Sequence, residues 1–201
     1  IVFLMISPKY YGVSIDISLL LMYNFSKANW NLSKNRIRRT DSPMNGEILE
    51  WYDSFLKLCK VLESLGCSYQ FEEPATEEEI IECEQKIGFT LPNDYKEWLK
   101  LTKCICMKNY DFNIYMPNEV FDSVDGYKAI QIGSIGISPR DYFINLENGK
   151  PLVYDDFEHE IIEFDSFDDM LDDMYIELES YANIYFPEKW VTIYDEMFPE
   201  N

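Results

Sequence analysis

Residues 76–101, TEEEIIECEQKIGFTLPNDYKEWLKL, predict two helices joined by a tight corner. Thr76 and Glu79 have the spacing of a capping box, in which an N-cap hydroxyl pairs with a carboxylate three residues later. Gly88 stands where a helix C-terminus favours a left-handed residue. Pro92 suits the first turn of the next helix, where its missing N–H costs nothing. The stretch carries no nucleophile, metal cluster or phosphate-binding glycine loop, so it predicts a fold more clearly than a reaction.

The apolar pattern on either side changes from helical to strand-like spacing. Upstream, residues 47–65 repeat apolar side chains at helical spacing. From residue 110 the period becomes two, which predicts strands. These strands are expected at 112–116, 127–132, 142–146, 152–154 and 161–164. Residues 67–71 are expected to form an extended link, and residues 103–108 a turn region.

The C-terminal third adds a hairpin and two further helices. Asn148-Gly149 between apolar runs is a strong hairpin signal. Ser166 is placed to cap a helix, and a short closing helix is expected around residues 190–198. Segregated helices and strands predict an α+β fold. In this fold, N-terminal helices pack against an antiparallel meander that is followed by a C-terminal helix.

Charge divides the chain near residue 43. Residues 1–43 hold six Lys/Arg against two Asp, whereas residues 44–201 hold eleven Lys/Arg against thirty-five Asp/Glu. We expect residues 1–43 to be a poorly specified extension that is not part of the native protein, with the natural start at or near Met44. A membrane-associating arm is the alternative. The domain is expected at 44–180, followed by an acidic, aromatic tail at 181–201.

Composition narrows the class of partner. The formal net charge is −20, and aromatic residues make up 16% of the chain, which argues against a disordered acidic protein. Such a charge repels nucleic acid and anionic membranes and steers a basic protein toward the surface. We therefore expect no nucleic-acid partner, and no membrane partner for residues 44–201. The alternative is an acidic, solvated surface with no specific meaning.

The cysteines indicate a reducing compartment. There are five, an odd number, and their spacing matches no zinc pattern. Buried thiols in a cytoplasmic protein fit best.

The candidate functional residues are mostly acidic. His159 is the single histidine, so a site with several histidine ligands is impossible. No catalytic, metal-binding or cofactor-binding residues are expected, and an enzyme is the least favoured class. The acidic turn before His159 and the acidic helix after Ser166 are instead expected to contact a partner, or else to be solvated. These candidate partner-binding residues are Asp155, Asp156, Glu158, Asp168, Asp169, Asp172 and Asp173.

The order of elements and several motifs resemble the SUKH superfamily. The first motif is Glu84, Gly88, Leu91-Pro92 and Tyr95, and the second is Gly149, Tyr154, the acidic turn ending at His159, and Ser166-Phe167. The resemblance covers roughly residues 74–178. The segment that follows the aromatic helix departs from it, because Thr102-Lys103-Cys104 stands where the family often has an Asn-Gly turn.

The resemblance implies a binding module, since the superfamily includes bacterial toxin-immunity proteins and the yeast cell-wall assembly regulator. It implies that Glu84, Gly88, Leu91, Pro92, Tyr95, Gly149 and Tyr154 have structural roles. The first hypothesis is an immunity-type protein that blocks a cognate toxin, such as a nuclease, by stoichiometric binding and occlusion. The second is a regulatory scaffold with several weak partners and no toxin.

Overall fold

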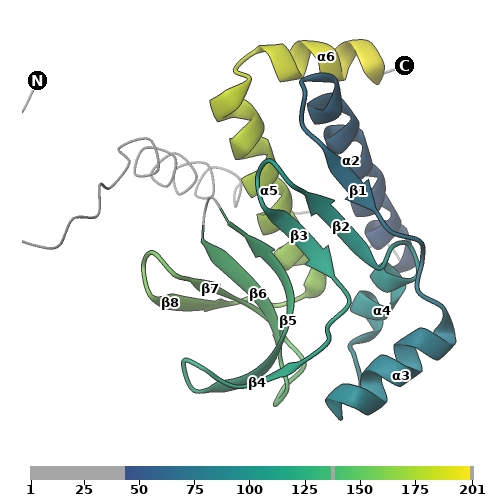
Figure 1. The fold of residues 1–201 in the computed structure, drawn as a ribbon, viewed down its shortest axis with the longest axis vertical. Helices are drawn as coiled ribbons and strands as arrows, with labels where there is room; N and C mark the ends of the chain where they lie inside the picture. The colour runs from purple at the N-terminus through teal and green to yellow at the C-terminus, as the bar shows by residue number, and fades with distance from the viewer. Residues whose placement is uncertain (1–43, 137–138, 200–201) are drawn as a thin grey trace, which may run out of the picture.

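The computed structural model of the chain describes residues 44–136 and 139–199 (Figure 1). The described part has five helices and one eight-stranded sheet, which confirms the predicted α+β class. The helices are α2 (Met44–Ser64), α3 (Glu77–Ile87), α4 (Asn93–Leu99), α5 (Phe167–Tyr185) and α6 (Lys189–Met197). The strands are β1 (Tyr69–Phe71), β2 (Cys104–Met107), β3 (Phe112–Tyr115), β4 (Val120–Val124), β5 (Tyr127–Ile135), β6 (Arg140–Asn145), β7 (Pro151–Asp155) and β8 (Glu160–Glu163). The interpretation of residues 1–43 falls outside the described residues.

The sheet is antiparallel throughout and contains the predicted meander. Its strand order is β1-β2-β3-β5-β6-β7-β8, and β4 pairs with β5 outside this path. Strand β5 is nine residues long. Its second half pairs with β3, and its first half pairs with β4. The last four strands follow one another in sequence and in space, and the hairpin predicted at Asn148-Gly149 joins β6 to β7.

Strand register gives the sheet two chemically different faces. Residues paired across antiparallel strands point to the same side. One row joins Met107, Phe112, Ile135, Arg140 and Asp155, and we call its side the inner face. The neighbouring row runs through Cys106, Asn113, Ser134, Asp141, Tyr154 and Ile161, and its side is the outer face.

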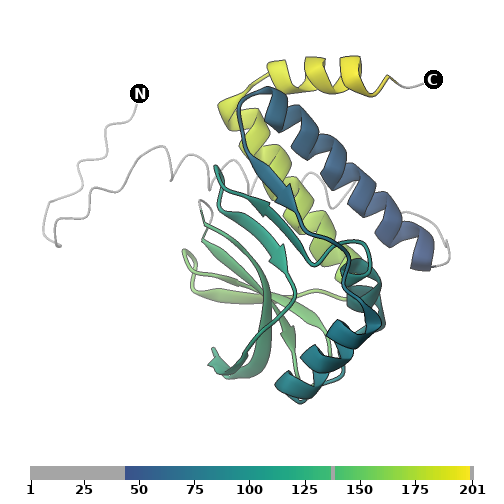
Figure 2. The same ribbon diagram turned by 45° about the vertical axis from the view of Figure 1, so that its right-hand side comes forward.

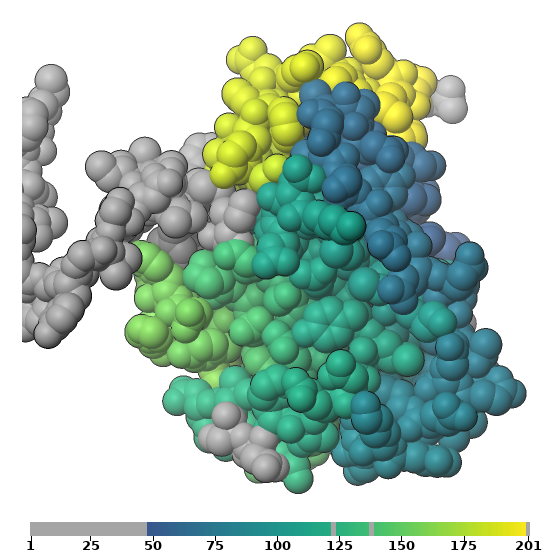
Figure 3. Space-filling view, viewed as in Figure 1, coloured from purple at the N-terminus to yellow at the C-terminus, as the bar shows by residue number. Residues whose placement is uncertain are grey.

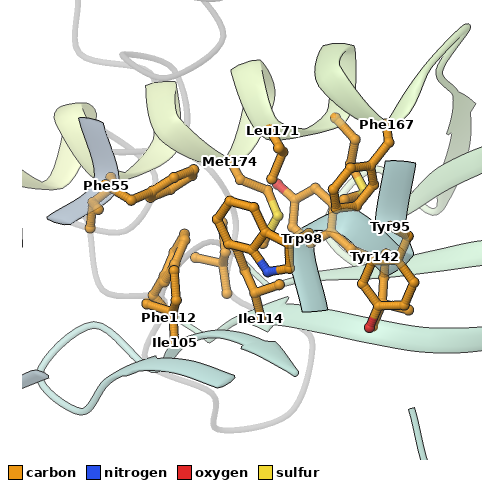
Figure 4. Packing of buried hydrophobic residues seen from close by; sticks show 14 of the residues in the cluster. Phe55, Tyr95, Trp98, Ile105, Phe112, Ile114, Tyr142, Phe167, Leu171 and Met174 are labelled. Carbon is orange, nitrogen blue, oxygen red and sulfur yellow. The ribbon is translucent and has the colours of Figure 1, made fainter. Parts of the chain in front are cut away.

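The helices cover the inner face, and the main core lies between the two layers (Figures 1 and 2). The fully buried Trp98 of α4 lies between α2 and the N-terminal part of α5. Its ring makes edge contacts with Phe55 and Phe167, with centroids 5.8 and 6.3 Å away. Figure 4 shows Leu171 and Met174 of α5 directed toward the same cluster. Edge-to-face aromatic pairs add about 0.5–1.5 kcal/mol each beyond burial, so these contacts help to hold α4 against α2 and α5.

The corner between α3 and α4 forms as predicted. Thr76 accepts a hydrogen bond from the Glu79 N–H, and the Glu79 carboxylate accepts one from the Thr76 N–H. Gly88 is left-handed, with φ 69°. The Glu84 carboxylate accepts a hydrogen bond from the Leu91 N–H at 2.8 Å, which satisfies a donor that the corner would otherwise leave without a helical partner. Pro92 is the residue before α4 and does not lie within its first turn.

Two segments expected to be a link and a turn are in fact strands. Residues 69–71 form β1 and residues 104–107 form β2, and these strands pair with each other. Both are short, so local sequence carries little strand signal. They are stabilised by pairing across the chain and by burial of Ile105 and Met107 on the inner face.

The C-terminal helices extend beyond the predicted domain end at residue 180. Helix α5 continues to Tyr185, and α6 confirms the closing helix expected around residues 190–198. Helix α6 packs on α2, with the Lys57 ammonium 5.8 Å from the centroid of the Phe198 ring. Across 44–136 and 139–199, each helix is too short or too polar to cross a bilayer.

Candidate partner-binding site

A buried arginine fastens α5 to the sheet. Arg140 opens β6 on the inner face and is 9% exposed. Its Nη1 donates to Glu177 at 2.8 Å and lies 3.5 Å from Asp173, and its Nε donates to Asp155 at 3.2 Å. Burial by itself would lower the pKa of Arg140, but the neighbouring carboxylates and Tyr142 outweigh burial and leave it raised. The guanidinium is therefore permanently charged and ties three elements together.

The same network is reinforced by two tyrosines. The Tyr142 hydroxyl donates to Asp173 at 2.8 Å, and the Tyr110 hydroxyl donates to the backbone carbonyl of Glu177 at 3.3 Å. Burial first, and the nearby carboxylates second, hold the pKa of both tyrosines well above 10. Both hydroxyls thus stay protonated as donors to α5.

Asp155 also shapes the hairpin between β7 and β8. Its Oδ2 accepts from Arg140, while its Oδ1 accepts from the backbone N–H groups of Phe157 and Glu158 at 3.0 and 3.1 Å. His159 takes a left-handed φ of 54° at the end of this turn, and its Nδ1 lies 3.3 Å from the Tyr154 hydroxyl. A buried charge therefore fixes the conformation of an exposed turn.

The structure divides the predicted partner-binding residues by burial. Asp155 and Asp173 are 2% and 5% exposed and belong to the Arg140 network. Their side chains are therefore placed for a structural role. Asp156 and Glu158 are exposed at the tip of the hairpin.

The remaining three acidic candidates lie on the first turns of α5. Asp168 and Asp172 are half-buried, and Asp169 is exposed. Asp169 completes the helix cap: its N–H donates to the Ser166 hydroxyl, which in turn donates to the Asp169 carboxylate. This group and the hairpin tip lie at opposite ends of β8, which spans about 13 Å at ~3.3 Å per residue. The acidic candidates therefore do not form one cluster.

Some residues of the family resemblance, including Pro92, Tyr95 and Gly149, line a shallow pocket at the start of α5. The pocket has a volume of about 110 Å³ and lies between the start of α4, the β6–β7 turn and the start of α5. Its lining includes Pro92, Tyr95, Gly149, Lys150, Ser166 and Phe167. The Tyr95 hydroxyl donates to the Tyr115 carbonyl at 2.6 Å, and Gly149 has a φ of 76° that permits the turn.

Burial keeps two of the cysteine thiols, those of Cys59 and Cys104, protonated. Burial raises the pKa of Cys59 to about 12 and that of Cys104 to about 11, so both stay protonated near neutral pH. The Cys83 thiol donates to the Pro117 carbonyl at 3.2 Å. All five cysteines are free thiols. In the described ranges, no group of three or more His, Cys, Asp or Glu side chains is arranged to hold a metal ion.

Sequence reasoning missed the Arg140 network, although two signals point to it. Arg140 is the only arginine in residues 44–201. Asp173 and Glu177 fall within the apolar stripe of α5, between Met170, Met174 and Leu178, where solvated residues are not expected. Acidic residues at core positions require a buried cation or hydrogen-bond donors.

Taken together, the fold and site define an α+β protein with a buried ion-pair network around Arg140 and exposed acidic residues on the β7–β8 hairpin and at the start of α5. The sequence matches the SMI1 / KNR4 family (SUKH-1) over residues 74–198, and the chain belongs to this family. The match extends through α6, beyond the motifs quoted above. A segment of 32 residues is 53% identical to a Bacillus subtilis (strain 168) protein described as "Uncharacterized protein YnaB". That segment covers 16% of this chain and 22% of the relative. No solved structure matches the chain.

Proposed function

We propose that this protein is an immunity-type binding protein. It neutralises a cognate toxin, a nuclease or another protein with a basic active-site groove, by stoichiometric binding and occlusion in the cytoplasm. It needs no catalysis and no cofactor. The observation that carries the proposal is the excess of acidic residues over 44–201 on a SUKH-1 domain.

Electrostatics supports the choice of a basic partner. Complementary charge raises the rate of encounter and disfavours wrong partners, whereas buried apolar anchors supply most of the affinity. The exposed carboxylates of Asp156, Glu158 and Asp169 are accessible for raising the rate of encounter with a basic partner. Aromatic side chains at the surface, including the 48% exposed Phe157, are available as apolar anchors that supply affinity. The partner is therefore expected to be a protein, and not a nucleic acid or a lipid surface.

Co-expression tests the proposal directly. The product of the adjacent gene is expressed in a bacterial host with and without this protein. The expected result is growth arrest that this protein relieves, together with a stoichiometric complex on size-exclusion chromatography with light scattering. Co-expression that gives neither relief of growth arrest nor a complex would refute the proposal.

A regulatory scaffold is the second candidate, because the superfamily also includes the yeast cell-wall assembly regulator. The two functions differ in the number and strength of partners. Affinity capture from the native host should recover one tightly bound basic protein for an immunity role. Several weakly bound proteins, with no toxin among them, would favour the scaffold.

A further inference from the structure

The outer face of the sheet is left without a helix by the described chain. All described helices lie on the inner side or at the ends of the sheet (Figures 1 and 2). In the space-filling view, the strand residues, teal to green, form much of the visible surface (Figure 3). This face belongs mainly to the meander that ends in the β7–β8 hairpin.

This face has an apolar centre of its own. Ala129, Phe143 and Leu152 are 0–4% exposed and form a second cluster, separate from the main core. Half-buried side chains from neighbouring strands pack around them: Phe121, Val124, Tyr127, Tyr154 and Ile161. Phe121 makes an edge contact with Phe143, with centroids 5.8 Å apart. Aromatic residues at a surface are the type enriched in protein interfaces.

The apolar centre is bordered by acidic groups. Asp141 follows Ser134 in the outer row and is half-buried, and it accepts a hydrogen bond from the Gln131 amide at 2.7 Å. Burial, together with the negative charge of Asp156, raises the pKa of Asp141. Asp156 and Glu158 are exposed on the adjoining hairpin. An incoming cation would relieve the repulsion between these carboxylates.

The hairpin tip presents its apolar side chain from a turn whose backbone is held by hydrogen bonds. Phe157 lies between Asp156 and Glu158 and is 48% exposed. The Asp155 carboxylate holds the Phe157 and Glu158 N–H groups, and Arg140 holds that carboxylate from inside the core. Because the tip is ordered before binding, contact with a partner loses less conformational entropy.

We propose that the outer face from β4 to β8, together with the β7–β8 hairpin tip, is the surface that docks a basic protein. Phe157 is its apolar anchor, and Asp141, Asp156 and Glu158 are its acidic border. This inference rests on the proposed function and names the surface that performs it. The occupant presents an apolar patch bordered by lysine or arginine. A second copy of this chain does not fit, because the same acidic residues would face one another.

Two pairs of matched variants of the full chain test the proposal against the co-expressed product of the adjacent gene. Phe157→Ala is matched by Ile81→Ala on α3, whose side chain is 49% exposed. The double variant Asp156→Lys/Glu158→Lys is matched by Glu78→Lys/Glu82→Lys, which makes the same change in charge on exposed residues of α3. All four variants change exposed residues, so thermal melting should remain near the wild-type value and serves as the check of folding.

The two outer-face variants are expected to weaken the complex and the two α3 variants to leave it unchanged. Phe157→Ala should raise Kd at least about tenfold, the effect of losing a hot spot worth about 1.4 kcal/mol. The double lysine variant should mainly slow association, and the loss should be largest at low salt. Hydrogen exchange of the complex should show protection at residues 141–163, and none in α3.

The outcomes separate this inference from the proposed function. If the wild-type protein forms no complex, both fail. If the wild-type complex forms and the outer-face variants bind as tightly as the α3 variants, the function stands and the surface is wrong. Self-association of the wild-type protein that Phe157→Ala abolishes would assign the face to a second copy and would also overturn the proposal.

Discussion

Replacing Arg140 by methionine tests whether the buried network holds the fold together. The guanidinium contacts Asp155 at 3.2 Å, Glu177 at 2.8 Å and Asp173 at 3.5 Å. The three carboxylates are 3–6% exposed, so water cannot replace the lost cation without opening the structure. Methionine keeps part of the aliphatic volume and removes the charge and the donors. We therefore expect the free energy of unfolding to fall.

The size of the loss follows from the burial of the network. Removing one partner from a buried ion pair costs about 3–5 kcal/mol. Domains of this size lose roughly 2–4 °C in Tm for each kcal/mol, so Tm should fall by roughly 6–20 °C. A loss of this size would take a large share of the typical stability of about 5–15 kcal/mol. Arg140→Lys should lie between the wild type and the methionine variant, because it keeps the charge but cannot contact all three carboxylates.

Urea unfolding followed by circular dichroism measures the difference in the free energy of unfolding between Arg140→Met and the wild type. Lys128→Met is the control, because it removes a positive charge from an exposed position on β5. An Arg140→Met variant within about 1 kcal/mol of Lys128→Met at neutral pH would refute the proposed role, because this is below the cost of a broken buried pair.

Three further predictions concern the corner, the sheet and the cysteines. The Thr76 N–H and Lys103 lower the pKa of Glu79 below its ordinary 4.5, so its contribution is present above that pH and lost as pH falls through the lower folded-state pKa. Glu79→Gln should therefore remove part of the acid-induced loss of stability. An unchanged decrease in the free energy of unfolding at acid pH would contradict this prediction. Gly133→Ala should destabilise more than Gly88→Ala, as measured by thermal melting. A Cβ at Gly133 meets the Asn113 carbonyl oxygen at 2.6 Å, whereas one at Gly88 meets only open space and a left-handed φ that costs about 1–2 kcal/mol. Cys59 and Cys104 should resist iodoacetamide at pH 8 in the folded protein, because pKa values of about 12 and 11 leave little thiolate. Mass spectrometry showing either residue modified before unfolding would be the contrary result.

Much of the fold could be predicted because its signals are local. The cap at Thr76, the left-handed Gly88 and the Asn148-Gly149 turn each depend on residues within a few positions along the chain. The same is true of the cap at Ser166. The period of apolar residues separated helices from strands, because each element buries one side. The order of these elements was enough to predict the α+β class.

Elements that depend on distant partners could not be predicted in the same way. Strands β1 and β2 are short, and their pairing joins Tyr69 to Met107 and Phe71 to Ile105. Strands β3 and β4 pair with different halves of β5, and this arrangement also depends on contacts between distant parts of the chain. These strand pairings minimise the backbone and apolar surface left exposed over the whole domain. A short window of sequence therefore cannot predict them.

The sequence by itself determined that this is an acidic α+β domain with SUKH motifs and no local pattern for catalysis. Only the tertiary structure decided which acidic residues are buried and which are exposed. Asp155 and Asp173 turn inward because Arg140 lies opposite them, while Asp156 and Glu158, one and three positions along from Asp155, remain exposed. The physical reason is that a carboxylate is stable in the interior only beside a cation or donors. Those groups are brought to Asp155 and Asp173 by strands and a helix far apart in the chain.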